Sequence, residues 1–386
     1  MAHDDGVPIV SSAFLTADEV DAALKRRLGR IHARQRLGIE KDHEARKFGQ
    51  GLTFLHFENL QTSHAMIEAI LRLSGTYWRG HANAGRVRLR TNDVFSPRLP
   101  AGFHGFTILH ITDLHADLSA DAVARTARLV APLHYDLCVL TGDYRGRTYG
   151  PYHASLRNML PLCEVLNGPV YGVLGNHDSI LMVPDLERMG IRMLLNEHVV
   201  IERADSGIFL AGIDDAHFYR MDNIEKAAAD MPPDMFSILL SHTPEIYRYA
   251  SHAGFDLLLA GHTHGGQICL PGGIPIILSS VLPRRMSRGA WKYHDMAGYT
   301  SVGAGSCGVP VRFNCSPEVT LHRLRRKDSE GQALEAPGET RSPAHTGSAT
   351  TQRAAMIRNA APPARAYSKP EAKVTRAIAR PAHSVP

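Results

Sequence analysis

The sequence predicts a layered α/β domain preceded by a helical N-terminal extension. From about residue 105 to residue 324, short apolar runs each end in a polar or glycine-rich turn, and helical stretches separate the runs. Such runs are typical of buried strands, and their alternation with helices is typical of layered α/β folds. Carboxylate and imidazole side chains follow several of the runs, which places a candidate metal site at the strand ends.

Two predicted helices form the N-terminal extension, over about residues 13–37 and 60–73. Thr16 and Glu19 have the spacing of a capping box, and apolar residues recur at helical spacing after them. Two interpretations remain open. The helices either pack on the core, or they present a basic amphipathic surface that contacts a membrane or a partner.

The central part of the chain shows six apolar runs that we interpret as strands, at 106–111, 137–140, 170–174, 208–211, 236–240 and 257–260. Predicted helices lie between them at 120–132, 154–166, 183–189 and 225–229. After about residue 325 the chain becomes rich in Pro, Ala, Ser, Thr and Arg, a composition typical of a disordered tail. We therefore predict an extension and lead-in over 1–100, a catalytic domain over 101–326 and a disordered basic tail over 327–386.

Composition indicates a globular protein of ordinary polarity, with 44% hydrophobic and 21% charged residues among 386. No apolar run approaches the ~20 residues that cross a bilayer, and the first residues lack the layout of a secretory signal, so we expect a cytoplasmic protein. Five cysteines without a CxxC pair fit reduced thiols. The net charge of +5 is weak evidence for a nucleic-acid partner. The sequence predicts no oligomeric state.

Five short segments carry potential metal ligands, at 112–115, 141–143, 174–178, 240–243 and 260–265. In an extended Asp-x-His segment both side chains point to the same side, so Asp113 and His115 can share one cation. The same geometry applies to His262 and His264. Asp143 is suited to bridge two metals through its two carboxylate oxygens. This mixture of oxygen and imidazole donors suits Mn, Fe or Zn better than Mg or Ca alone.

The ordered set Asp-x-His, Gly-Asp, Gly-Asn-His-Asp, His and Gly-His-x-His resembles the signature of the calcineurin-like metallophosphoesterases. The resemblance implies a four-layer α/β/β/α sandwich and two divalent cations. It places a first cation on Asp113, His115, Asp143 and His264. It places a second cation on Asp143, Asn176, His242 and His262.

In this chemistry, two cations activate a bridging hydroxide that attacks the phosphorus atom. His177 lies beside Asn176 in the sequence and is not among the implied ligands. It is suited to contact the phosphate and to protonate the leaving group, with Asp178 or another carboxylate orienting its ring.

Segments 190–197, 211–215, 261–268 and 310–318 resemble the branch of this family that includes bacterial YkuE- and YaeI-type phosphodiesterases. The resemblance implies hydrolysis of a phosphodiester or pyrophosphate. Because a related branch is similar to UDP-diacylglucosamine pyrophosphatases, a lipid-linked substrate is one alternative. Membrane-proximal members of this branch usually begin with an export or transmembrane segment, whereas here a helical extension stands in its place. Peripheral attachment to the cytoplasmic face of the inner membrane is therefore a further alternative.

Two rival functions stay open at this point: a nuclease with the same metal signature, and a metal-binding scaffold without catalysis. The chain lacks the basic stripe interleaved with aromatic residues that single-strand binding uses. Arg145, Arg147 and Tyr149 form either a loop over the substrate or an exposed basic loop. The cleft is one expected location for Asp214, Asp215 and His217. For Asp215 the alternative is that it caps a turn. His110, His134 and His153 receive no functional role.

Overall fold

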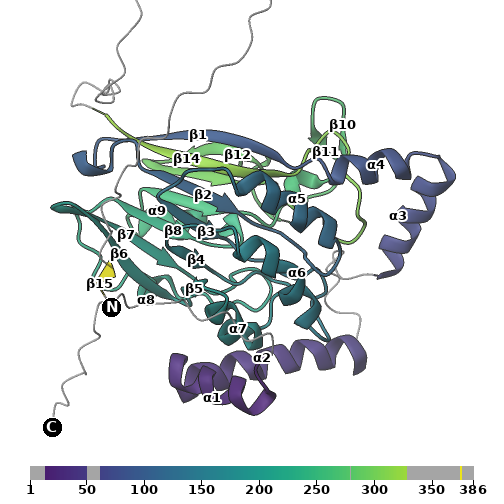
Figure 1. The fold of residues 1–386 in the computed structure, drawn as a ribbon, viewed down its shortest axis with the longest axis horizontal. Coiled ribbons are helices and arrows are strands. Elements are labelled where there is room, and N and C mark those ends of the chain that lie inside the picture. Colours follow the sequence, from purple (N-terminus) through teal and green to yellow (C-terminus); the bar gives the residue numbers. More distant parts are fainter. Residues whose placement is uncertain (1–13, 50–60, 279, 328–373, 376–386) are drawn as a thin grey trace, which may run out of the picture.

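The computed structural model describes residues 14–49, 61–278, 280–327 and 374–375. Two large β-sheets lie face to face, with helices against the outer face of each (Figure 1). No helix in these ranges is both long enough and apolar enough to cross a membrane.

The first sheet has the strand order β1-β14-β2-β3-β4-β5. β1 pairs in parallel with β14, β14 pairs antiparallel with β2, and the remaining pairs are parallel. Its strands are β1 (Arg88–Ser96), β2 (Thr107–Ile111), β3 (Leu137–Leu140), β4 (Val170–Gly172), β5 (Arg192–Met193) and β14 (Glu318–Arg326).

The second sheet has the strand order β12-β13-β9-β8-β7-β6-β15. Its strands are β6 (Glu197–Arg203), β7 (Ser206–Gly212), β8 (Ser237–Leu240), β9 (Leu257–Ala260), β12 (Gly289–Tyr293), β13 (Met296–Thr300) and β15 (Val374–Thr375). A separate two-stranded ribbon consists of β10 (Cys269–Leu270) and β11 (Ile274–Pro275).

Three apolar clusters separate four layers. The central cluster contains side chains from both sheets, such as Ile108 of β2 and Leu240 of β8. Leu109 and Ile111 point to the opposite side of β2, into the cluster shared with the helices outside the first sheet. A third cluster joins the second sheet to α8 and α9. This arrangement confirms the predicted α/β/β/α sandwich.

Four helices of the catalytic domain, α5 to α8, overlap the predicted ranges, and the fifth, α9, was not predicted. They are α5 (Ala120–Val130), α6 (His153–Cys163), α7 (Val183–Arg188), α8 (Ile224–Ala227) and α9 (Tyr247–His252). α5, α6 and α7 contribute to the cluster outside the first sheet. Short helix-strand connections then bring the carboxyl ends of β2, β3 and β4 to one edge of that sheet.

The N-terminal extension contains α1 (Ala17–Leu28) and α2 (Arg30–Gly49), followed by α3 (Gln61–Leu73) and α4 (Tyr77–Ala84). The capping box of Thr16 and Glu19 is confirmed. One continuous helix over 13–37 was wrong, because Gly29 has a φ of 81° and interrupts it between α1 and α2. In Figure 1, α1 and α2 lie beside α7, while α3 and α4 project on another side near the β10–β11 ribbon.

The six expected strands correspond to β2, β3, β4, β7, β8 and β9, so the other described strands were not in the sequence expectations. β1 lies at the edge of the first sheet and precedes the predicted catalytic domain. In the tail, β15 pairs with β6, while 328–373 and 376–386 lie outside the described residues. The predicted disorder of the tail and the three domain boundaries therefore stay predictions.

Candidate metal centre

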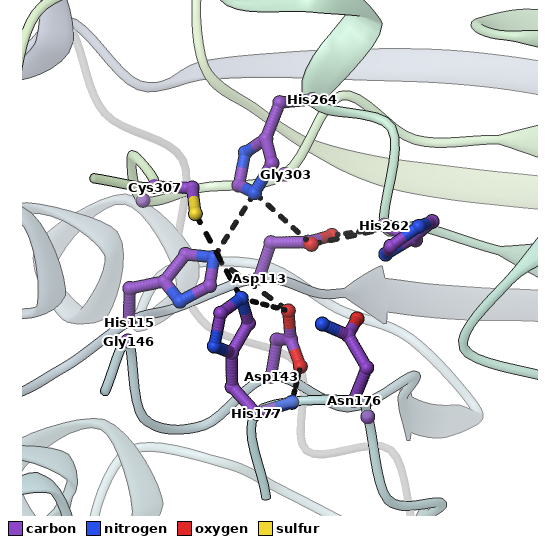
Figure 2. A network of polar contacts seen from close by, with 12 residues as sticks. Asp113, His115, Asp143, Gly146, Asn176, His177, His262, His264, Gly303 and Cys307 are labelled. Carbon is purple, nitrogen blue, oxygen red and sulfur yellow. Dashed lines mark hydrogen bonds and ion pairs between the residues drawn. The ribbon is translucent and has the colours of Figure 1, made fainter. Parts of the chain in front are cut away.

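The seven candidate ligands named from the sequence converge on one buried location between the strand ends of the two sheets, and Figure 2 labels all of them except His242. Asp113 and His115 follow β2, Asp143 follows β3, and Asn176 follows β4. His242 follows β8, and the remaining two ligands, His262 and His264, follow β9. His264 is the most exposed of the seven, at 7%.

The backbone at this site is in a conformation that side chains other than glycine rarely adopt. Five of the seven residues have positive φ: Asp113 (52°), His115 (44°), Asp143 (55°), His262 (70°) and His264 (49°). Residues are held in the left-handed region only when the surrounding structure determines them, and they concentrate at functional sites. The expected extended Asp-x-His geometry was therefore wrong, because these residues lie beyond the ends of their strands and have positive φ.

Two groups of potential ligand atoms share the Asp143 carboxylate. One consists of Asp113, His115 and Asp143, and the other of Asp143, His242 and His262; within each group the ligand atoms lie within 4.8 Å of one another. Oδ2 of Asp143 is 3.3 Å from Nε2 of His242 and 3.8 Å from Nε2 of His115. The shared carboxylate has the placement that a bridge between two cations requires.

His262 and His264 lie on different sides of the site, which corrects the expected same-side geometry of an extended segment, while their assignment to two different cations stays a prediction. Nε2 of His264 is 3.0 Å from Nε2 of His115 and 3.4 Å from Oδ1 of Asp113. His262 belongs to the group of Asp143 and His242. The turn geometry between the two histidines removes the strand alternation on which the expectation depended.

Backbone carbonyls fix the tautomers of two histidines. Nδ1 of His115 donates to the carbonyl oxygen of Arg145 (3.0 Å), and Nδ1 of His242 donates to that of Thr141 (2.8 Å). Because a carbonyl can only accept, Nδ1 carries a proton in each ring, and Nε2 is the nitrogen that faces the site. Nε2 of His262 is buried without a hydrogen-bond partner among the described residues. These donors fit a bound cation.

The carboxylates sit in a strongly coupled electrostatic environment. Burial raises the pKa of Asp113. Burial alone would also raise the pKa of Asp143, but the imidazoles of His242 and His177 outweigh it and hold that pKa well below its usual range. Burial likewise opposes the charged form of His242, yet the Asp143 carboxylate raises the pKa of His242 to about 10. A cation bound at His242 would take the place of that proton.

Two glycines allow the loops to approach these carboxylates. A Cβ on Gly175 would lie 2.2 Å from Oδ1 of Asp143, and a Cβ on Gly261 would lie 2.4 Å from Oδ2 of Asp113. Both distances are far below van der Waals contact. The Gly-Asn-His-Asp and Gly-His-x-His motifs thus need their glycines for close packing against the ligands of other strands.

His177 lies at the edge of the ligand cluster. Its Nε2 is 3.9 Å from Oδ2 of Asp143, and its Nδ1 is hydrogen-bonded to Oγ1 of Thr148 at 2.7 Å. Of the two expected alternatives, Asp178 or another carboxylate, the Asp178 carboxylate instead accepts N–H groups from the backbone. Its donors are Asp143 (2.7 Å), Tyr144 (2.9 Å), Arg145 (3.2 Å) and Gly175 (2.8 Å).

The other candidates named from the sequence have structural contacts. Arg145 is buried, and its guanidinium donates to the carbonyl oxygens of His177, Thr148 and Gly150, so it is not an exposed basic residue. Asp215 caps a turn by accepting from the backbone of residues 217–219. Asp214 contacts Arg36 of α2.

Two residues near the site were missed by sequence reasoning. Arg312 is fully buried, and its Nη2 lies 3.2 Å from Nδ1 of His264. Sγ of Cys307 lies 3.8 Å from Nε2 of His177. Both belong to the loop between β13 and β14. Arg312 lies inside a segment that carries the family resemblance, but nothing local to either residue indicates a contact with a histidine.

Residues 106–266 match the model of the calcineurin-like phosphoesterases. The chain is 34% identical over 266 residues to the uncharacterized metallophosphoesterase YkoQ of Bacillus subtilis (strain 168), covering 66% of this chain and 97% of YkoQ. It is 30% identical to the phosphodiesterase YaeI of Escherichia coli (strain K12), covering 57% and 82% of the two chains. It is 26% identical to the UDP-2,3-diacylglucosamine pyrophosphatase LpxG of Chlamydia muridarum (strain MoPn / Nigg), covering 64% and 92%.

Proposed function

The chain belongs to the calcineurin-like metallophosphoesterases, and on this premise we propose that it hydrolyses a phosphodiester or pyrophosphate bond with two divalent cations. Hydrolysis of phosphoric esters with bound metal is the activity of the family. The observation that carries the dinuclear proposal is the Asp143 carboxylate, which belongs to two different groups of buried ligand atoms.

The residues present fit two cations. One position would be held by Asp113, His115, Asp143 and His264. The other would be held by Asp143, Asn176, His242 and His262. Oriented imidazoles at His115 and His242 and the buried Nε2 of His262 support this assignment. Oxygen and nitrogen donors in this mixture favour Mn, Fe or Zn.

A bound pair of cations supplies an activated hydroxide and neutralises charge on the phosphate. The protein's own contribution is to hold these donors rigidly in a buried site. His177 has one ring nitrogen engaged by Thr148 and the other directed toward Asp143 (Figure 2). In this proposal His177 contacts the phosphate and holds the proton that the leaving oxygen receives.

The substrate class in this proposal is a phosphodiester or pyrophosphate that is lipid-linked or a nucleotide. LpxG, whose name gives a diacylated sugar nucleotide as its substrate, supports the lipid-linked alternative. A cytoplasmic location is part of the proposal, and the five cysteines, which form no disulfide in the structure, are consistent with it.

The proposal includes peripheral contact with the inner membrane through the N-terminal helices. Met66, Ile70 and Leu73 recur at helical spacing on one face of α3 and are exposed by 60%, 57% and 89%. Ile67 and Leu71, on the other face, pack against the segment that contains Val311. Trp78 of α4 adds a further apolar group with 69% exposure. Such a face is suited to insert into the boundary between headgroups and acyl chains.

Hydrolysis of bis(p-nitrophenyl) phosphate and p-nitrophenyl phosphate tests the dinuclear proposal. Metal-free protein is reloaded with Mn²⁺ and compared with Asp143→Ala and with Asp295→Ala, a control in the exposed turn between β12 and β13. We expect metal-dependent turnover in the wild type and the control and none in Asp143→Ala. Faster hydrolysis of bis(p-nitrophenyl) phosphate would indicate a diesterase, and faster hydrolysis of p-nitrophenyl phosphate a monoesterase. Wild-type turnover in Asp143→Ala would contradict the proposal.

A further inference from the structure

Cys307 directs its sulfur into the metal centre from the loop between β13 and β14 (Figure 2). Its Sγ lies 3.8 Å from Nε2 of His177. Together with ligand atoms of His115 and His264 it forms a third group of potential metal donors, all within 4.8 Å of one another. From the sequence, Cys307 was expected only to be one of five reduced thiols.

We infer that Cys307 is an additional metal ligand, which contributes a thiolate to the cation position shared by His115 and His264. This inference rests on the proposed function, because it concerns the same pair of cations. On binding, the thiol proton leaves to solvent and a sulfur lone pair forms the bond to the cation, so no oxidant or reductant takes part.

The backbone of Cys307 is held by the segment that carries the histidine ligands. Its N–H donates to Oε1 of Gln267 (2.8 Å), and its carbonyl oxygen accepts from Nε2 of Gln267 (3.0 Å). Gln267 lies three residues after His264 and itself has a φ of 53°. The side-chain amide of Gln267 therefore fixes both backbone groups of Cys307 relative to His264, as a built ligand site requires.

Two contacts that do not involve the cysteine describe the metal centre, one at the position of His262 and one at the position shared by His115 and His264. Nε2 of His262 is buried without a hydrogen-bond partner among the described residues. Nε2 of His264 donates to Nε2 of His115 at 3.0 Å, because Nδ1 of His115 carries the proton of its own ring and donates to a carbonyl. Two nitrogens bonded to one cation at about 2.1 Å each lie at most about 4.2 Å apart, so this pair fits a shared ion.

The other cysteines have different surroundings. Cys138 and Cys163 belong to or pack against the apolar cluster outside the first sheet, where burial raises the pKa of Cys163 to about 12. Cys269 and Cys315 cluster with Val302, and their sulfurs donate to the carbonyl oxygens of Gly265 and His264. Among the five, Cys307 has its sulfur grouped with imidazole donors.

A thiolate donor has a consequence for the choice of metal. Thiolates bind Zn²⁺ and other borderline or soft cations in preference to Mn²⁺ and Mg²⁺. The position shared by His115 and His264 should therefore prefer Zn²⁺, while the position of Asn176, His242 and His262 lacks sulfur. The two cations would differ in identity or in affinity.

Titration of the metal-free protein with Co²⁺ tests this inference, because a Co²⁺–thiolate bond produces a charge-transfer absorption in the near ultraviolet that oxygen and nitrogen donors do not. The comparison is between wild type, Cys307→Ser and the control Cys163→Ser, which makes the same change in α6. We expect the absorption in wild type and control and its loss in Cys307→Ser. We also expect the affinity for Zn²⁺ relative to Mn²⁺ to fall by about tenfold or more in Cys307→Ser.

Alkylation gives a second readout that does not depend on the variant being folded. Iodoacetamide should modify Cys307 of the wild-type protein more slowly after Zn²⁺ is added, while the rate at Cys163 stays unchanged. Co²⁺ binding without a Cys307-dependent absorption, or alkylation of Cys307 unaffected by Zn²⁺, would overturn the inference and leave the dinuclear proposal standing. Failure of the wild type to bind Co²⁺ would overturn both.

Discussion

Nε of Arg36 lies 3.1 Å from Oδ2 of Asp214, and both side chains are completely buried. Arg36 belongs to α2, whereas Asp214 follows β7, so this ion pair joins the N-terminal extension to the second sheet. The same guanidinium pairs with Glu40 (2.6 Å) and lies 3.8 Å from the centre of the Tyr219 ring. The extension is therefore fixed to the catalytic domain by a buried polar network.

Replacing Arg36 with alanine should destabilise the protein strongly, because it leaves the Asp214 carboxylate buried without its cation. Loss of one partner of a buried ion pair costs about 3–5 kcal/mol. Urea unfolding followed by circular dichroism measures the change. Lys25→Ala removes an exposed ion pair of α1 and should leave the midpoint almost unchanged. Equal midpoints for the two variants would show that the buried network contributes nothing to stability.

Glu40 extends this network toward the metal centre. Its carboxylate accepts from Oγ of Ser179 (2.6 Å) and from the backbone N–H of Ile180 (2.7 Å), directly after the segment that contains Asn176 and His177. The position of α2 is thus coupled to a loop that bears a metal ligand. We expect Arg36→Ala to lower turnover in addition to stability.

His177→Ala should reduce turnover by about 10²–10⁴-fold without loss of metal, because His177 supplies a proton and is no ligand in the proposed site. Thr148→Val, which removes the hydroxyl bonded to Nδ1, should produce a smaller loss. Hydrolysis of bis(p-nitrophenyl) phosphate and metal content by atomic emission are measured on the same samples, with the exposed His134→Ala as control. A parallel loss of metal in His177→Ala would assign His177 to coordination instead.

Asp178→Asn should weaken metal binding by about 10–100-fold, the range typical when a residue that orients ligands is replaced. The carboxylate of Asp178 accepts four backbone N–H groups from the loops that carry Asp143 and Asn176. An amide would turn an NH₂ group toward two of these donors and force the loops apart. Calorimetric titration with Zn²⁺ measures the affinity, with Asp295→Asn as the matched control. Unchanged affinity would mean that the loops keep their positions without this carboxylate.

Leu73→Asp combined with Trp78→Ser should weaken binding to phospholipid vesicles if α3 and α4 contact the membrane. Burying one large apolar side chain contributes about 1.5–3 kcal/mol, so the double variant should bind more than about tenfold less tightly. Sedimentation with vesicles of phosphatidylethanolamine and phosphatidylglycerol measures binding, and Tyr249→Ser of α9, exposed by 68%, is the control. Equal sedimentation of wild type and double variant would remove the membrane contact from the proposal.

The layered α/β pattern and the convergence of the candidate ligands could be predicted from the sequence, because both leave local signals. Buried strands appear as apolar runs, and the ligands follow them in short motifs. β1 left no such signal, since its outward side chains are mostly polar and its place depends on pairing with β14, more than 200 residues later in the chain. Arg36 and Asp214 also meet only in the folded chain. The positive φ angles at Asp113 and His115 could not be predicted, because tertiary contacts impose them against the intrinsic preference of these residues.

His110 and His322 should make the protein lose stability in acid. The two rings belong to one chain of hydrogen bonds. Nδ2 of Asn92 donates to Nδ1 of His322 (3.0 Å), and Nε2 of His322 lies 3.3 Å from Nδ1 of His110. Nε2 of His110 then donates to Oγ1 of Thr141 (2.8 Å). Both imidazoles are fully buried, and burial lowers the pKa of His110 to about 3 and that of His322 well below its usual value. The folded protein therefore holds both rings neutral.

In the unfolded chain these histidines take up protons near pH 6.5, whereas in the folded protein they do not until the pH is far lower. The unfolded state thus binds more protons in this window, and the free energy of unfolding falls as the pH decreases from about 6.5. Each buried histidine contributes a slope of up to about 1.4 kcal/mol per pH unit. His322→Gln should reduce the slope between pH 6 and pH 4.5 by up to that amount, while His134→Gln should not. Urea unfolding at a series of pH values measures these slopes. Metal-free protein is used so that metal release does not contribute to them. Parallel curves for His322→Gln and wild type would show that His322 is protonated in the folded state.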